Sequence, residues 1–251
     1  MNELTKSGRD AVLRRYTPAR VGLGRTGVSL ATRELLDFQL AHARARDAVH
    51  AQLDSGSLAR TLSEVRGAEV LRLRSKAGDR ATYLQRPDLG RTLDDASREM
   101  LAGKRMSGEQ VLSLVVADGL SALAVERHAA AMLKELLPRL GAWTLAPIAI
   151  VELGRVAVGD EIGQALGAAL VVVLIGERPG LSSPDSMGAY LTWRPRPGRT
   201  DAERNCISNI RAEGLGPPEA AAELASTLEK ASRAQLTGVA LRTADRRIRE
   251  G

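Results

Sequence analysis

Three apolar runs in the second half of the chain constrain its fold most strongly. Val111–Ala117, 146–151 and 170–175 stay hydrophobic without alternating with polar residues. Strands covered on both faces show this pattern, whereas half-exposed strands alternate. Helical stretches at 122–137 and 160–166 separate the runs and leave room for right-handed crossovers. We therefore predict an α/β fold: a Rossmann-like, mostly parallel sheet with flanking helices.

The chain before these runs has a different, mainly helical pattern. A glycine-rich loop at 17–27 precedes a predicted helix over 32–53. Thr92 and Asp95 have capping-box spacing before a short helix near 96–101. Short strands are expected around Val70–Arg74 and 81–85.

The predicted boundary between the two patterns is the segment 103–108, which begins and ends with glycine. It divides the chain into a mainly helical N-terminal region, 1–105, and a Rossmann-like domain, 106–251. In the second region a further strand is expected at 190–193, and a final helix starts at Pro217.

The positive charge of the chain lies in its first half. Residues 1–105 carry 20 basic and 13 acidic side chains, against 16 and 17 in the rest, and 31 of the 36 cations are arginine. Arginine binds phosphates and carboxylates in a bidentate manner, so a basic nucleic-acid-binding module is one alternative. The basic residues are interleaved with acids, however, and no zinc-finger or RNP pattern occurs. A partner-facing surface rich in arginine is therefore favoured, with no nucleic acid.

Cysteine content and hydropathy indicate the cellular compartment of the protein. The single cysteine cannot form an internal disulfide, and residues 1–6 lack the apolar stretch of a secretory signal. No apolar run approaches the roughly 18 residues that span a bilayer. We expect a cytoplasmic protein without a membrane contact.

Common site motifs are missing from the sequence. No GxGxxG follows the first strand, and neither GxxxxGK[ST], CxxC nor HExxH occurs. We therefore predict no metal site, and an ordinary NAD or ATP enzyme is disfavoured. An autonomous Rossmann-like nucleotide-binding enzyme remains an alternative, but a subunit whose chemistry is completed by a cofactor or another chain fits better.

Ligands of open α/β sheets bind outside the carboxyl ends of the strands, so the segments after the apolar runs are candidate sites. In 118–121, a glycine permits a tight turn and Ser121 can cap the next helix. In 152–156, Gly154 would let a backbone approach a flat ligand, and Arg155 could face a phosphate or a partner.

Two later segments carry more distinctive side chains. In the polar loop 176–186, Glu177 could accept hydrogen bonds from a ligand or pair with Arg178. The polar segment 205–210, expected as a loop, holds the only thiol. A nucleophilic cysteine needs a base, and all three histidines are expected on helices as surface or core residues. We assign no catalytic residue. The histidines are His42, His50 and His128.

Taken together, five segments resemble the small-subunit (light-chain) family of ethanolamine ammonia-lyase. The combination of ERPGL and CISNI is far more specific than any single motif, and the resemblance runs in order from about Ala19 to Gly238. The segments are 83–91 (YLQRPDLGR), 118–121 (DGLS), 154–156 (GRV), 176–181 (GERPGL) and 205–210 (NCISNI).

This resemblance implies an adenosylcobalamin-dependent lyase that converts ethanolamine to acetaldehyde and ammonia by a radical mechanism. The small subunit would cover the corrin, while a large subunit holds the substrate in a hetero-oligomer of heterodimers. Region 1–105 would contact the large subunit. By motif, the family's cobalamin contacts fall on Val156, Glu177 and Cys206.

Two further expectations concern the cofactor and the start of the chain. Cobalamin proteins that replace the cofactor's own base carry Asp-x-His-x-x-Gly, and no histidine here has this context, so base-on binding is expected. Some family members have an extended N-terminal segment that directs packing into a microcompartment. Only about 18 residues precede the resembling part here, so encapsulation is not expected.

Overall fold

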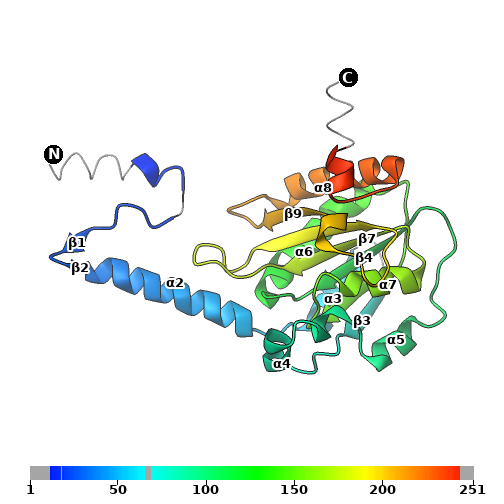
Figure 1. Ribbon diagram of the computed structural model, residues 1–251, viewed down its shortest axis with the longest axis horizontal. Coiled ribbons are helices and arrows are strands. Elements are labelled where there is room, and N and C mark those ends of the chain that lie inside the picture. Colours follow the sequence, from blue (N-terminus) through cyan, green and yellow to red (C-terminus); the bar gives the residue numbers. More distant parts are fainter. Residues whose placement is uncertain (1–11, 18, 66–68, 244–251) are drawn as a thin grey trace, which may run out of the picture.

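The computed structural model describes residues 12–17, 19–65 and 69–243. They form a mixed α/β protein in which helices flank a central seven-stranded sheet (Figure 1). The N-terminal stretch 1–6, for which no secretory signal is expected, lies outside the described residues. Across the described residues, no helix is long and apolar enough to cross a membrane.

The central sheet confirms the predicted parallel core. The strands of the sheet are β3 (Val70–Arg74), β4 (Val111–Ala117), β5 (Thr144–Leu145), β6 (Ile148–Glu152), β7 (Leu170–Gly176), β8 (Met187–Trp193) and β9 (Arg204–Ile210). Their order is β3-β6-β4-β7-β8-β9, with β5 beside β4. The strands from β3 to β7 pair in parallel, whereas β8 and β9 are antiparallel additions. Because helices cover both faces of the parallel part, β4 and β7 are buried throughout.

Helices cover both faces of this sheet. The helices are α2 (Thr32–His50), α3 (Ser55–Glu64), α4 (Arg80–Gln85), α5 (Asp95–Leu101), α6 (Ala122–Leu136), α7 (Val158–Leu166) and α8 (Pro217–Ala234), with 3-10 turns at Leu89–Arg91, Leu137–Arg139 and Asp201–Glu203. The larger core lies under α3, α6 and α8, and the second core lies under α5 and α7. The helices predicted between the apolar runs and after Pro217 are thus confirmed.

One predicted strand is wrong. Residues 81–85 lie in α4, where the side chain of Asp79 caps the helix by accepting from the backbone N–H of Thr82 at 2.9 Å. Tyr83, which lies on this helix, is fully buried. The aromatic and β-branched residues favoured a strand, but the cap and the burial of the aromatic ring decide for a helix.

The cap of α5 also differs from the prediction. Asp94, rather than the expected pair of Thr92 and Asp95, caps the helix by accepting from the backbone N–H of Ser97 at 2.8 Å. The helix itself is confirmed, one residue earlier than expected.

Both predicted regions contribute to the sheet. β3 is confirmed at Val70–Arg74 within the region 1–105, and it pairs in parallel with β6 from the other region. The sheet therefore draws on residues from both sides of the segment 103–108.

The N-terminal residues 12–50, here called the arm, extend away from the sheet. A short hairpin, β1 (Arg25–Thr26) and β2 (Ser29–Leu30), leads into α2, which projects from the body of the protein (Figure 1). Of the twelve large hydrophobic side chains that are exposed in the described part of the chain, nine lie on the arm. These are Val12, Leu13, Tyr16, Val28, Leu30, Leu35, Leu36, Phe38 and Leu40.

A buried ion pair ties α7 to the last strand of the sheet. The guanidinium of Arg204 donates through Nη1 and Nη2 to the two carboxylate oxygens of Asp160, at 2.8 and 2.6 Å. Both side chains are at most 2% exposed. Thr192 accepts a further bond from Nη1 of Arg204 at 2.7 Å and the carbonyl of Arg199 accepts one from Nη2 at 3.1 Å, whereas Nε of Arg204 is buried without a hydrogen-bond partner among the described residues.

Candidate functional site

The turn after β4 holds two strand ends together. Gly119 has a φ of +55°, and a Cβ there would lie 2.2 Å from the carbonyl oxygen of Gly176. No other residue fits both the backbone conformation and the space. Ser121 caps α6 by accepting from the N–H of Ala124 at 3.3 Å, as predicted. The segment 118–121 is therefore a structural turn.

Asp118, the first residue of that turn, is buried beside a buried cation. Its carboxylate lies 3.4 Å from Nη1 of Arg80 and accepts from the N–H of Gly154 at 3.0 Å. Burial raises the pKa of Asp118 to about 6, although the charge of Arg80 and the backbone N–H groups lower it. This group therefore fixes the loops after β4 and β6 to each other.

The raised pKa predicts a pH-dependent stability. Below pH ~4 the carboxyl of Asp118 is protonated in both folded and unfolded chains; between ~4 and ~6 the folded chain retains the proton that the unfolded chain loses. The free energy of unfolding contributed by this group therefore falls as the pH rises through that window, by roughly 2–3 kcal/mol in total. Urea titrations of the chain and of Asp118→Asn at pH 4 and 7 measure it. The gap between the two proteins should change with pH; a constant gap would contradict the assignment.

The loop after β6 packs against the protein rather than offering backbone to a ligand. A Cβ on Gly154 would lie 3.1 Å from side-chain atoms of Ala117 and Val151, so the glycine accommodates neighbouring strands. The Arg155 guanidinium lies over the Tyr83 ring, 4.2 Å from its centroid. The expectations for Gly154 and Arg155 are thus replaced by internal packing, which joins the segments 83–91 and 154–156.

Val156 follows these residues, two positions before α7 begins at Val158. It is half-buried and packs against the core on the α7 side of the sheet. Tyr190, on β8, packs against the same core and is also half-buried. Val156 and Tyr190 therefore border one side of the sheet.

Glu177 follows β7 and is held by two donors. Its Oε2 accepts from the hydroxyl of Ser186 at 2.5 Å and from the backbone N–H of Asn209 at 3.2 Å. No ion pair joins it to Arg178 within the described ranges, so of the two sequence alternatives the ligand acceptor remains. The carboxylate is half-buried at the edge of the sheet.

Cys206 lies on a strand, not on the loop that the sequence suggested. The polar segment 205–210 forms β9, because Ile207 and Ile210 reach the core under α8 while the polar side chains between them stay outside. Cys206 is exposed and pairs in register with Tyr190. Desolvation raises the pKa of the thiol, a hydrogen bond from Tyr190 lowers it, and the charge of Glu177 raises it. A protonated thiol is a poor nucleophile, so Cys206 suits a contact role.

These residues define an open face of the sheet: Gly188 and Tyr190 on β8 with Cys206 and Ser208 on β9. Cys206 and Ser208 are exposed there, and Glu177 lies at its edge. Glu177 and Cys206 are brought together around Tyr190, whose pKa is raised by burial and by both neighbours. Sequence reasoning missed Tyr190, Gly188 and Asn209, because the pairing of β8 with β9 could not be read from the chain. Gly188 within an otherwise apolar strand was the available signal.

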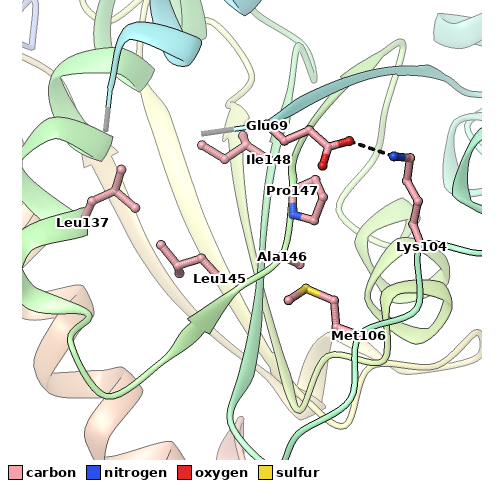
Figure 2. A pocket seen from close by; sticks show the side chains of 8 residues that line it. All are labelled: Glu69, Lys104, Met106, Leu137, Leu145, Ala146, Pro147 and Ile148. Atoms are coloured by element: carbon pink, nitrogen blue, oxygen red, sulfur yellow. Dashed lines mark hydrogen bonds and ion pairs between the residues drawn. The ribbon is translucent and has the colours of Figure 1, made fainter. Parts of the chain in front are cut away.

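The cavity in Figure 2 lies at the opposite edge of the sheet, where the parallel strands begin. It measures about 490 Å³ and has an apolar lining apart from Glu69 and Lys104. These two side chains form an ion pair of 2.7 Å, and Figure 2 shows them pointing toward each other. They are the only charged side chains among its lining residues, and they pair with each other. The lining residues are Glu69, Lys104, Met106, Leu137, Leu145, Ala146, Pro147 and Ile148.

The described residues of the open face include no cluster of metal ligands and no histidine that could act as a base. Among the described residues no group of three or more His, Cys, Asp or Glu side chains could hold a metal ion. His42 and His50 are exposed on the arm, and the ring of His128 is buried 3.3 Å from the carboxylate of Asp185. All three histidines lie on helices, as expected.

Fold and site together define an α/β protein that presents an open, strand-end surface with a polar edge, suited to ligand contact. A sequence model of the family described as ethanolamine ammonia-lyase light chain matches residues 9–242. The chain therefore belongs to the ethanolamine ammonia-lyase light-chain family, a family of lyase subunits, as the segments from 83–91 to 205–210 indicated.

Individual relatives agree with this assignment. The chain is similar to the ethanolamine ammonia-lyase small subunit of Xanthomonas campestris pv. campestris, with 54% identity over 248 residues, covering 96% of this chain and 91% of the relative. The small subunit of Pseudomonas fluorescens is 57% identical over 234 residues, covering 92% and 85%. That of Pseudomonas aeruginosa is 56% identical over 236 residues, with the same coverage.

Proposed function

We propose that this chain is the small subunit of an adenosylcobalamin-dependent ethanolamine ammonia-lyase, which converts ethanolamine to acetaldehyde and ammonia. Family membership over residues 9–242 carries the proposal. The open face supports it, because the exposed Cys206 and Ser208 lie beside a carboxylate that can accept hydrogen bonds from a cofactor with many amide groups. In this proposal residues 106–251 form a Rossmann-like domain that binds cobalamin.

The residues of the open face fit the cofactor in shape and chemistry. Gly188 on β8 is buried, and it lets Glu177 and Tyr190 approach closely: a Cβ there would lie 2.9 Å from Oε1 of Glu177 and 3.2 Å from the ring of Tyr190. In this proposal Val156 supplies apolar contact, Glu177 accepts a hydrogen bond, and Cys206 packs beside the corrin. The bound cofactor supplies the radical that acts on the substrate. No residue of this chain is assigned a catalytic role.

The positions of the histidines support base-on binding of the cofactor, which is part of this proposal. None of the three lies at the open face, and His128 is engaged by Asp185. Electron paramagnetic resonance of the cob(II)alamin form should therefore show the cofactor's own base as the nitrogen ligand. Coupling to a protein imidazole would contradict this part of the proposal.

The second partner in the proposal is the large subunit, which would bind the arm and hold the substrate. A concentration of exposed apolar side chains on a projecting arm is typical of an interface. Residues 12–50 carry seven arginines and three acidic residues, so two arms would repel each other and an acidic partner surface is favoured. The assembly would be a hetero-oligomer of heterodimers in the cytoplasm.

Reconstitution tests the proposed function directly. This chain, the large subunit, adenosylcobalamin and ethanolamine are mixed, and acetaldehyde is followed beside controls that each lack one component. We expect acetaldehyde only when all four are present. Full activity without this chain, or none in a verified complex of both subunits, would contradict the proposal.

A further inference from the structure

The pairing of β8 with β9 contains a bulge beside Glu177. Met187 pairs with Ile210 and Ala189 with Ile207, so Gly188 faces two residues, Ser208 and Asn209. A bulge disrupts the ladder locally and re-aims backbone groups. Here Asn209 has a φ of +60°, and its N–H donates to Oε2 of Glu177 instead of to β8.

The bulge also gives the two oxygens of Glu177 different surroundings. Oε2 accepts two donors, the hydroxyl of Ser186 and the N–H of Asn209. Oε1 lies over Gly188, 2.9 Å from the position that a Cβ would occupy. Within the described ranges no donor reaches Oε1. One oxygen therefore fixes the carboxylate, and the other is left to accept from a ligand.

Asn209 is itself held in this position by the turn that follows β9. Its carbonyl accepts from the N–H of Leu215 at 2.8 Å. A Cβ on Gly214 would lie 2.4 Å from the same carbonyl oxygen, so the turn closes tightly over Asn209. The donor to Glu177 is thus preorganised rather than recruited by a ligand.

We propose that Ser186, Gly188 and Asn209 are positioning residues that present Oε1 of Glu177 as an acceptor for one amide N–H of the cobalamin. This inference rests on the proposed function and deepens it by naming the cofactor group that is recognised. A carboxylate accepts but cannot donate, so it selects an amide over a carboxylate at the same place on the corrin edge. Corrinoids that carry an acid at this position are disfavoured by like charge.

The first experiment measures cobalamin binding to the complex of both subunits, by equilibrium dialysis with cyanocobalamin. Gly188→Ala pushes a methyl group towards Oε1 and should weaken binding about 10-fold or more. Gly141→Ala is the matched control, because nothing lies within 4 Å of its Cβ position and its affinity should not change. Ser186→Ala removes one of the two donors to Oε2 and should weaken binding less than Gly188→Ala does. Circular dichroism confirms that each variant is folded.

The second experiment exchanges the acceptor for a donor. Glu177→Gln keeps an oxygen for Ser186 and Asn209 but places an NH₂ where Oε1 was. The probes are cyanocobalamin and its three monocarboxylic acids, in each of which one peripheral propionamide is hydrolysed. The unaltered complex should bind one of the acids about 10-fold more weakly than the amide form, and Glu177→Gln should reduce or reverse that preference.

The outcomes separate this inference from the proposed function. If the unaltered complex binds no cobalamin, the proposed function is wrong and the inference falls with it. If it binds cobalamin, but Gly188→Ala and Glu177→Gln bind all four probes as the unaltered complex does, only the positioning inference is overturned. A preference that is reduced or reversed in Glu177→Gln supports the inference. Equal weakening of all four probes would overturn it, because that is the result of a merely structural role of Glu177.

Discussion

Replacing Asp160 with alanine is expected to lower the free energy of unfolding by about 3–5 kcal/mol, because it leaves the buried charge of Arg204 without a counter-charge. The neutral isostere in Asp160→Asn should cost a similar amount, since shape is retained but the charge is not. The loss should appear as a lower urea midpoint, followed by circular dichroism.

The matched control for this prediction is Asp201→Ala. Asp201 also approaches Arg204, at 3.6 Å, but its side chain is fully exposed, and solvent screens such a pair. This variant should unfold with the midpoint of the unaltered chain. Equal losses in Asp160→Ala and Asp201→Ala would show that Arg204 does not depend on the buried partner.

The second large effect is expected on assembly. Changing Leu36 and Phe38 of α2 to aspartate should weaken binding of the large subunit about 100-fold or more, because buried apolar anchors dominate interface energies. The two side chains are 57% and 41% exposed, so the chain alone should remain folded. Analytical ultracentrifugation or surface plasmon resonance with the large subunit measures the affinity.

Two exposed apolar residues away from the arm serve as controls for the assembly prediction. Met100→Asp and Val239→Asp change side chains that are 45% and 60% exposed elsewhere on the body. They should leave the affinity for the large subunit unchanged. If the arm variants bind normally, or if the control variants lose as much affinity, the arm is not the interface.

The order of elements around the parallel core could be predicted from local pattern. Val111–Ala117 and the run at 170–175 are apolar without alternation, and Ser121 and Pro217 mark helix starts whatever their surroundings. The family was predictable for the same reason, because motifs such as GERPGL and CISNI are contiguous in the chain. Glu177 and Cys206, as candidate residues, follow from these motifs.

The secondary structure was predicted wrongly where the local preference of the side chains conflicts with their long-range contacts. Residues 81–85 carry strand-forming side chains, yet Asp79 caps them into a helix that buries Tyr83. The polar segment 205–210 looks like a loop until Ile207 and Ile210 are placed against the core under α8. In both cases the deciding contact joins residues that no local pattern relates.

By itself, the sequence determined the α/β class, the parallel core, most helices and the family, because each depends on short-range periodicity or on contiguous motifs. Only the tertiary structure decided which residues share a site. The bulge opposite Gly188, the N–H of Asn209 on Glu177 and the pairing of Cys206 with Tyr190 arise from the register of two antiparallel strands. Register is set by how side chains pack across the whole sheet, so no single segment encodes it.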